Sequence, residues 1–215
     1  ENLSILKLLS PYIPKMVLEK ARTTLSRGLS SLPIESEDAT IFFADLAGFT
    51  HVSETMNHQQ IVELLNLIMS TIVTSIERHG GYVDKFIGDG VMCIFFDPLS
   101  AIIAGVEIQN NLINLNEFRA MSGQPLLEMR IGINSGKVIL GSIGTKERMD
   151  WTALGDVVNT ASRIESNTPV NNVGISETTY ELIRLNVLIK SIYTIKLKGN
   201  EKEQTILFVD SVNFY

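Results

Sequence analysis

The sequence predicts an α+β fold with a ferredoxin-like β-α-β-β-α-β core, in which an antiparallel sheet carries its helices on one face. Three short apolar runs, at 40–46, 82–87 and 91–96, have the length and composition of strands. One helix is expected at 57–78, where apolar residues recur at helical spacing, and a second helix is expected at 99–119. These segments follow one another in the order that the fold requires.

Local signals mark the ends of the first long helix and the turn of the first hairpin. Asn57 is a suitable helix cap, and a pair of glycines at 80–81 is suited to end the same helix. Asp89 and Gly90 form the Asp-Gly pair that is typical of a tight hairpin turn.

A second hairpin and several short elements are expected in the C-terminal half. Ser135 and Gly136 predict a turn between strands at 127–134 and 137–142. The elements expected after this hairpin are a helix from Gly155 to about Ser166, a strand near Val173, a short helix from Ser176, and strands at 191–197 and 204–209.

Residues 1–34 are expected to form a helical lead segment, and residues 35–215 the main domain. Two prolines, at 11 and 14, divide the lead into short helices. Pro33 and the polar run at 35–38 separate the lead from the domain. Because the chain does not start with Met, we expect it to be a piece of a longer protein.

The composition is ordinary for a globular protein and limits the classes of partner. The 24 Asp and Glu against 18 Lys and Arg give a net charge of −6, which disfavours nucleic-acid binding. The one cysteine, Cys93, allows neither a disulfide nor a cysteine-based metal site and fits a cytoplasmic setting. No apolar run reaches the roughly eighteen residues of a transmembrane helix, although a segment outside this chain could anchor the full-length protein to a membrane.

Two carboxylates stand where the predicted fold brings strand ends together. Asp45 lies near the end of an apolar strand, and Asp89 lies at a hairpin tip. These neighbouring carboxylates would repel each other unless a cation neutralised them. Magnesium is held by one or two carboxylates together with substrate phosphates. The alternative is that Asp45 ends a strand and Asp89 is an ordinary turn residue, which is the better explanation of Asp89 taken alone.

Asn159 and Arg163 are four residues apart and therefore share one face of the helix that is expected after Gly155. An amide and a guanidinium on one face suit a ribose and a phosphate. Taken alone, the pair is better explained as an exposed polar face.

Together these elements resemble the class III nucleotidyl cyclases, the family of adenylyl and guanylyl cyclases. Residues 43–50 match the family pattern Phe-x-Asp-Ile-x-Gly-Phe-Thr, with Leu46 in the usual Ile place. Residues 85–89 match Lys-or-Glu-x-x-Gly-Asp, and residues 155–163 match Gly-Asp-x-Val-Asn-x-Ala-Ser-Arg. The likeness covers most of the chain, and it implies the class III cyclase fold with extra C-terminal strands beyond the ferredoxin-like core.

The resemblance implies that Asp45 and Asp89 bind two divalent metal ions, Mg²⁺ or Mn²⁺. The backbone carbonyl of Leu46 would also face a metal. The loop that contains Phe49 and Thr50 would offer amide groups to a triphosphate.

The remaining roles in the reaction also come from the resemblance. Asn159 would hold the ribose, and Arg163 would stabilise the charge on the α-phosphate in the transition state. Lys198 matches the family's lysine for the terminal phosphate, and Arg130 is a second candidate for that task. For Lys198 the alternative is a solvated lysine at a strand end. The implied reaction is attack of the ribose 3′-oxygen on the α-phosphorus, with pyrophosphate leaving.

The two purine-reading positions of the family are Lys85 and Thr152 in this sequence. Lys85 can only donate, which suits the N1 acceptor of adenine, and Thr152 can accept from the 6-amino group. Guanylyl cyclases usually carry Glu and Cys here. Guanine has a donor at N1 and would leave Lys85 without an acceptor, so ATP should be preferred by roughly tenfold or more over GTP. The Lys–Thr pair resembles the bacterial and soluble branch of adenylyl cyclases. Because a hydroxyl can also donate, the preference could be weaker than with the Asp of many adenylyl cyclases.

In the resembled family, the metal carboxylates come from one subunit and the Asn, Arg and base-reading residues from the other. This chain carries both sets, so a head-to-tail homodimer with shared sites is expected. Residues 1–34 resemble segments that connect such domains to an upstream sensor. The alternatives are a guanylate cyclase and a catalytically silent, nucleotide-binding domain of the same fold.

Overall fold

The computed structural model describes residues 2–54, 56–145, 147–196 and 203–213. Its helices are α1 (Asn2–Leu9), the short 3-10 helix η1 (Ser10–Tyr12), α2 (Lys15–Ser26), α3 (Phe49–Glu54), α4 (His58–Arg78), α5 (Pro98–Met121), α6 (Asp156–Asn167) and α7 (Glu177–Ile183). Its strands are β1 (Glu35–Ala47), β2 (Tyr82–Ile87), β3 (Gly90–Phe95), β4 (Glu128–Gly144), β5 (Met149–Leu154), β6 (Asn172–Ser176), β7 (Val187–Lys196) and β8 (Glu203–Val212).

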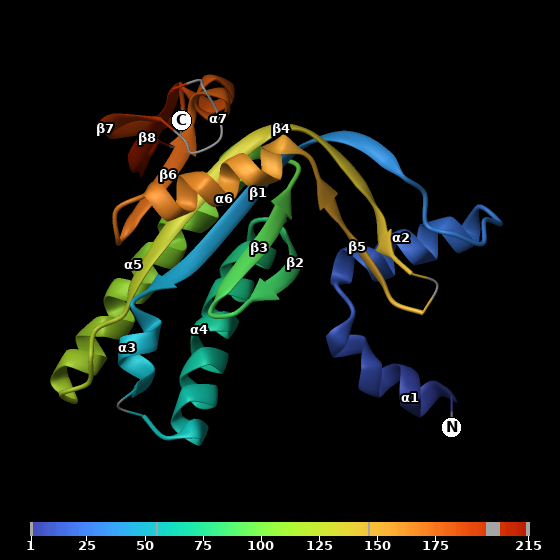
Figure 1. Cartoon of the computed structure of the whole chain (residues 1–215), viewed down its shortest axis with the longest axis horizontal. Coiled ribbons are helices and arrows are strands. Elements are labelled where there is room, and N and C mark those ends of the chain that lie inside the picture. Colours follow the sequence, from blue (N-terminus) through green and yellow to red (C-terminus); the bar gives the residue numbers. More distant parts are fainter. Residues whose placement is uncertain (1, 55, 146, 197–202, 214–215) are drawn as a thin grey trace.

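The strands form one open sheet in the order β2-β3-β1-β4-β6-β8-β7, with β5 paired to β4 (Figure 1). The first four strands of this order are the ferredoxin-like core, and they are paired antiparallel. The predicted α+β class, core and C-terminal extension are therefore confirmed. The sheet is not wholly antiparallel, because β6 runs parallel to β4 after the crossover through α6.

The hairpin predicted at Ser135 and Gly136 is wrong, because both residues lie inside the continuous strand β4. Ser135 pairs with Thr40 of β1, and their buried hydroxyls are 2.8 Å apart. A Cβ at Gly136 would lie 2.9 Å from a methyl group of Val157, so this glycine gives room to α6 and does not form a turn. The chain reverses after β4 instead, where Thr145 donates its backbone N–H to the carbonyl of Arg148.

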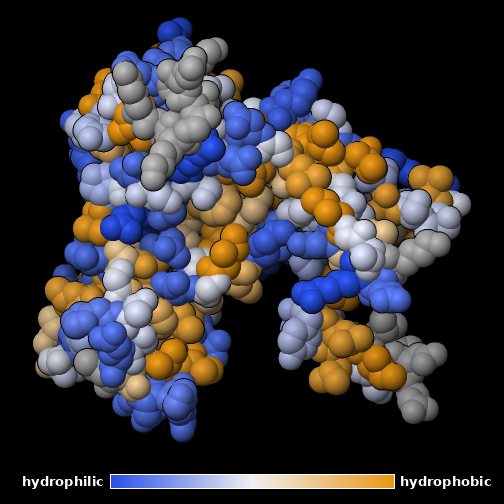
Figure 2. Space-filling model, in the orientation of Figure 1, coloured by the Kyte–Doolittle hydropathy of each residue, from blue (hydrophilic) through white to orange (hydrophobic). Residues whose placement is uncertain are grey.

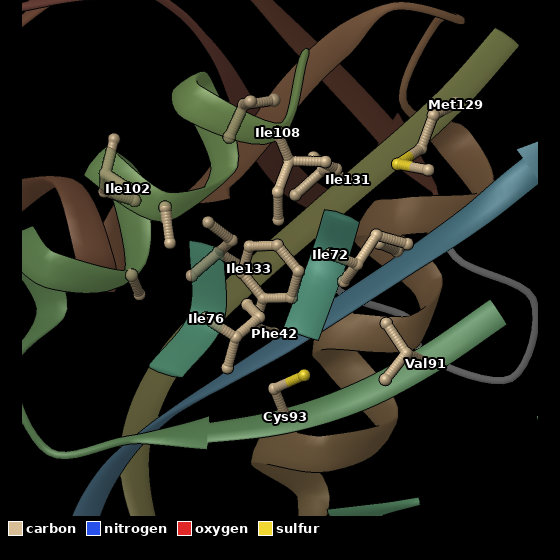
Figure 3. Packing of buried hydrophobic residues seen from close by; sticks show 14 of the residues in the cluster. Phe42, Ile72, Ile76, Val91, Cys93, Ile102, Ile108, Met129, Ile131 and Ile133 are labelled. Carbon is tan, nitrogen blue, oxygen red and sulfur yellow. The ribbon is translucent and has the colours of Figure 1, made fainter. Parts of the chain in front are cut away.

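The larger hydrophobic core lies on one face of the sheet, under α4 and α5. Phe42, Ala44 and Leu46 of β1 point into it, as the alternation of a strand requires. Figure 3 shows Phe42 surrounded by Ile72 and Ile76 of α4 and by apolar residues of α5, β3 and β4. α4 is long and apolar enough to cross a membrane by length and composition, but its row of isoleucines is buried in this core.

The two core helices α4 and α5 lie on one face of the sheet, as predicted, whereas α6 and α2, which are outside that core, cover the opposite face. Ile41 of β1 belongs to a second apolar cluster there, with Met16 of α2, Trp151 of β5 and Ala161 of α6. The polar run at 35–38, interpreted as a separator, is the beginning of β1 and pairs with β4. An ion pair between Lys20 and Glu35 connects α2 to the start of β1.

Gly132 is the point where α6 crosses closest to the sheet, so Gly132→Ala is expected to destabilise the fold. A Cβ there would lie 2.1 Å from the backbone nitrogen of Glu165, which can move only if the whole helix moves. We expect a loss of about 1–3 kcal/mol in the free energy of unfolding, measured by chemical denaturation. The matched control is Gly141→Ala in the same strand, where the nearest atoms are 3.4 Å away. Equal stability of the two variants would contradict this packing.

Candidate active site

The predicted metal-binding pair, Asp45 and Asp89, is brought together at one end of β1. Asp45 is half-buried and lies two residues before the end of that strand, and Asp89 lies in the turn between β2 and β3. A Cβ at Gly90 would lie 2.6 Å from Oδ1 of Asp45, so a glycine here lets this carboxylate lie over the hairpin. Burial and the negative charge of Asp89 raise the pKa of Asp45, and Arg130 partly offsets them.

The charges around Asp45 fit a divalent cation. Two carboxylates in a partly desolvated place destabilise each other, and a cation with oxygen ligands removes that cost. Among the residues that the structure describes, no group of three or more His, Cys, Asp or Glu could hold a metal. A cation held here would therefore need further oxygen ligands, which a bound triphosphate can supply.

Arg130 and Glu165 complete this cluster, and no local pattern in the sequence points to Glu165. Arg130 is the direct β4 partner of Asp45, so both side chains lie on the same face of the sheet. Glu165 of α6 is 8% exposed, and its pKa is raised first by burial. The charges of Asp45 and Asp89 also raise this pKa, and the charge of Arg130 lowers it. Its buried position depends on the crossing of α6 over Gly132, which leaves no local signal.

The turn after β1 places the start of α3 next to the carboxylates. Gly48 has φ +70°, which glycine adopts without strain. Phe49 packs against the core and Thr50 is exposed. The side chain of Leu46 is buried in the core, so only its backbone is available to a ligand.

The predicted purine-reading residues, Lys85 and Thr152, lie in a second group between β2 and β5. Nζ of Lys85 donates to Oδ2 of Asp150 at 2.6 Å and lies 3.5 Å from Oδ2 of Asp84. Oγ1 of Thr152 donates to the same oxygen of Asp84 at 2.6 Å. Asp84 therefore connects the two predicted residues, although neither aspartate was singled out from the sequence. The available signal was their position in the sequence, because Asp84 is adjacent to Lys85 and Asp150 is two residues before Thr152.

The pKa values in this second group reflect its burial and its charges. Burial raises the pKa of Asp84, and the hydrogen bond from Thr152 and the charge of Lys85 partly offset it. Burial alone would lower the pKa of Lys85, but Asp150 and Asp84 raise it overall. The ammonium group is therefore firmly charged.

A groove of about 680 Å³ opens beside this group. It is lined by Lys85, Asp84 and Asp150 on one side and by residues 11–15 on the other. Figure 2 shows a deep hollow between the part of the molecule that holds α3 and α4 and the part formed by β5 and the N-terminal helices. Thr152 is 5% exposed and lies behind Asp84.

α6 turns its predicted residues away from the carboxylates of its own chain. Asn159 is exposed and Arg163 is half-buried. Arg163 precedes Glu165 by two residues, which is about 200° around a helix, so the two point in opposite directions. Glu165 faces the Asp45 cluster, so Arg163 faces the other way. Lys198 lies outside the described residues.

Comparisons with known proteins agree with this architecture. The family described as "Adenylate and Guanylate cyclase catalytic domain" matches residues 33–210. The adenylate cyclase of Anabaena cylindrica is 35% identical over 181 residues, which are 78% of this chain and 36% of that protein. The chain also spans only 8% of the adenylate cyclase of Dictyostelium discoideum that it matches.

Two solved structures have the same fold. The guanylyl cyclase Cya2 is similar with a TM-score of 0.78 and 35% identity, over 83% of this chain and 94% of that one. The adenylyl cyclase CyaB from P. aeruginosa is similar with a TM-score of 0.79 and 32% identity, over 84% and 97%. The chain belongs to the family of class III nucleotidyl cyclase catalytic domains. Its relatives include adenylate and guanylate cyclases at similar identity, so they do not distinguish the purine.

Proposed function

We propose that this chain is the catalytic domain of an adenylate cyclase, which converts ATP to 3′,5′-cyclic AMP and pyrophosphate. The observation that carries this proposal is the group of Lys85, Asp84 and Thr152. It combines a charged donor with a buried hydroxyl oxygen whose lone pairs can accept a hydrogen bond. That pattern is complementary to N1 and the 6-amino group of adenine, and it opposes the N1–H and O6 of guanine.

The proposed reaction assigns the other side chains to the triphosphate and the ribose. Arg130 and the amides at Phe49 and Thr50 bind phosphate oxygens, Asn159 orients the ribose, and Arg163 stabilises the charge that develops at the α-phosphate. Metal ions held by Asp45 and Asp89 would supply positive charge that lowers the pKa of the 3′-hydroxyl and neutralises the leaving phosphates.

We further propose that the working form is a head-to-tail homodimer. The orientation of Arg163 supports this, because it points away from Asp45 of its own chain. A second copy, related by a two-fold axis, can present its Arg163 to this Asp45, and each dimer then has two equivalent sites.

The direct test is the rate of product formation from ATP and GTP, measured side by side with Mg²⁺ and with Mn²⁺. We expect kcat/KM for ATP to exceed that for GTP by roughly tenfold, because guanine would leave a buried donor and acceptor unmatched. A higher value for GTP would mean that the domain is a guanylate cyclase. Binding of ATP without any cyclic product would mean that it is a silent nucleotide-binding domain.

A further inference from the structure

The hydroxyl of Thr152 donates its hydrogen bond to Asp84. Oγ1 of Thr152 is 2.6 Å from Oδ2 of Asp84, and the side chains are 5% and 6% exposed. We propose that Asp84 is a positioning residue that fixes the Thr152 hydroxyl as a hydrogen-bond acceptor toward the purine, and so makes the site select adenine. This inference rests on the proposed reading of the base by Lys85 and Thr152.

The donor and acceptor roles follow from the chemistry of the three groups. An ionised carboxylate can only accept, so the proton between Asp84 and Thr152 comes from the hydroxyl. Burial raises the pKa of Asp84, but the hydrogen bond from Thr152 and the charge of Lys85, 3.5 Å from the same carboxylate oxygen, oppose this shift and favour the ionised form. Because both side chains are buried, water does not compete for the hydroxyl proton. The remaining lone pairs of Thr152 can only accept.

A break in the register of β2 brings these residues together. The pairing of β2 with β3 shifts between Val83 and Lys85, at Asp84. Such a bulge redirects a side chain. Here Asp84 and the adjacent Lys85 both reach β5, where they contact Thr152 and Asp150. Two consecutive residues of a regular strand would point to opposite faces.

The fixed hydroxyl removes an ambiguity of the Lys–Thr pair. A freely rotating hydroxyl accepts from the 6-amino group of adenine or donates to O6 of guanine. With its proton committed to Asp84, Thr152 can satisfy only adenine, as a carboxylate at this position would.

The test is the ratio of kcat/KM for ATP to kcat/KM for GTP in the purified full chain. Asp84→Ala should lower this ratio by roughly tenfold, because the freed hydroxyl can then donate to guanine. Asp84→Asn should retain most of the ratio, because its amide oxygen can still accept from Thr152. The matched control is Asp150→Ala, which removes the other carboxylate on Lys85 without touching Thr152 and should also retain the ratio. An Asp84→Ala ratio equal to that of the unmodified chain overturns the proposal.

A second comparison does not depend on the folding of an Asp84 variant. The unmodified chain should use ATP better than purine riboside triphosphate, which keeps the N1 acceptor and lacks the 6-amino group. This advantage should disappear in Thr152→Val. If Thr152→Val keeps the advantage, Asp84 itself or another group reads the amino group, and the orientation proposal is wrong.

The combined variant separates orientation from a general structural effect. Adding Asp84→Ala to Thr152→Val should not change the purine ratio further, because no hydroxyl is left to orient. An independent, additive change would overturn the proposal. If the unmodified chain prefers GTP, the adenylate cyclase assignment is refuted. The role of Asp84 is then judged separately, by whether Asp84→Ala lowers the ATP-to-GTP ratio from that starting value.

Discussion

Asp45→Asn is expected to lower the rate of cyclic AMP formation by roughly a thousandfold or more. Its carboxylate would hold the metal ions whose charge stabilises the transition state by several kcal/mol, and about 1.4 kcal/mol corresponds to each factor of ten. The amide has nearly the same shape, so the loss would come from charge. The control is Asp38→Asn, an exposed aspartate of the same strand, which should keep its activity. Comparable activity of Asp45→Asn and the unmodified chain would refute the metal site.

The same variant should separate loss of function from loss of stability. Burial and Asp89 raise the pKa of Asp45, so its folded pKa exceeds its unfolded pKa. Such a group stabilises the fold below the unfolded pKa, and that contribution is lost as the pH rises through the folded pKa. At neutral pH the charged Asp45 therefore destabilises the metal-free fold. Metal-free Asp45→Asn should melt at the same or a higher temperature than the unmodified chain. Mn²⁺ should raise the melting temperature of the unmodified chain but not of the variant.

Arg163→Ala is expected to lower activity by roughly a hundredfold to a thousandfold, the usual cost of removing a group that stabilises developing charge. The variant should still restore activity to Asp45→Asn when the two are mixed. In a mixed dimer, one site combines the intact Asp45 of one chain with the intact Arg163 of the other. Random exchange of equal amounts makes half of the dimers mixed, with one working site of two. The expected recovery is therefore about a quarter of the unmodified activity.

A second mixture is the matched control for this experiment. Asp45→Asn and Asp89→Asn alter the same half of the site, so every site in their mixed dimer lacks one carboxylate. This pair should remain inactive under the conditions that restore the first pair. Recovery in both mixtures, or in neither, would contradict a site shared between two chains.

The sequence alone was sufficient for the core order and for the family. Periodicity and turn chemistry act over a few residues, so the long helices and the β2–β3 hairpin could be predicted from local pattern. The motifs around Asp45, Asp89 and Arg163 also lie within short segments. Their chemistry could be recognised without knowing what packs against them.

The errors and omissions share one physical cause, which is contact between segments far apart in the chain. Ser135 and Gly136 have turn-forming side chains, but pairing with β1 and the close approach of Val157 hold them in a strand. Glu165 reads as part of an ordinary polar helix until the crossing at Gly132 buries it beside Asp45. No local pattern contains either contact.

The sequence by itself determined the candidate residues for the chemistry, which are Asp45, Asp89, Lys85, Thr152 and the Asn159–Arg163 pair. Only the tertiary structure decided how they are grouped. The strand pairing of β1 with β4 adds Arg130 to the carboxylates, and the bulge in β2 adds Asp84 to Lys85 and Thr152. The packing of α6 turns Arg163 away from its own Asp45. Side-chain chemistry is a property of single residues, whereas direction depends on strand register and helix packing, which bring together segments distant in the chain.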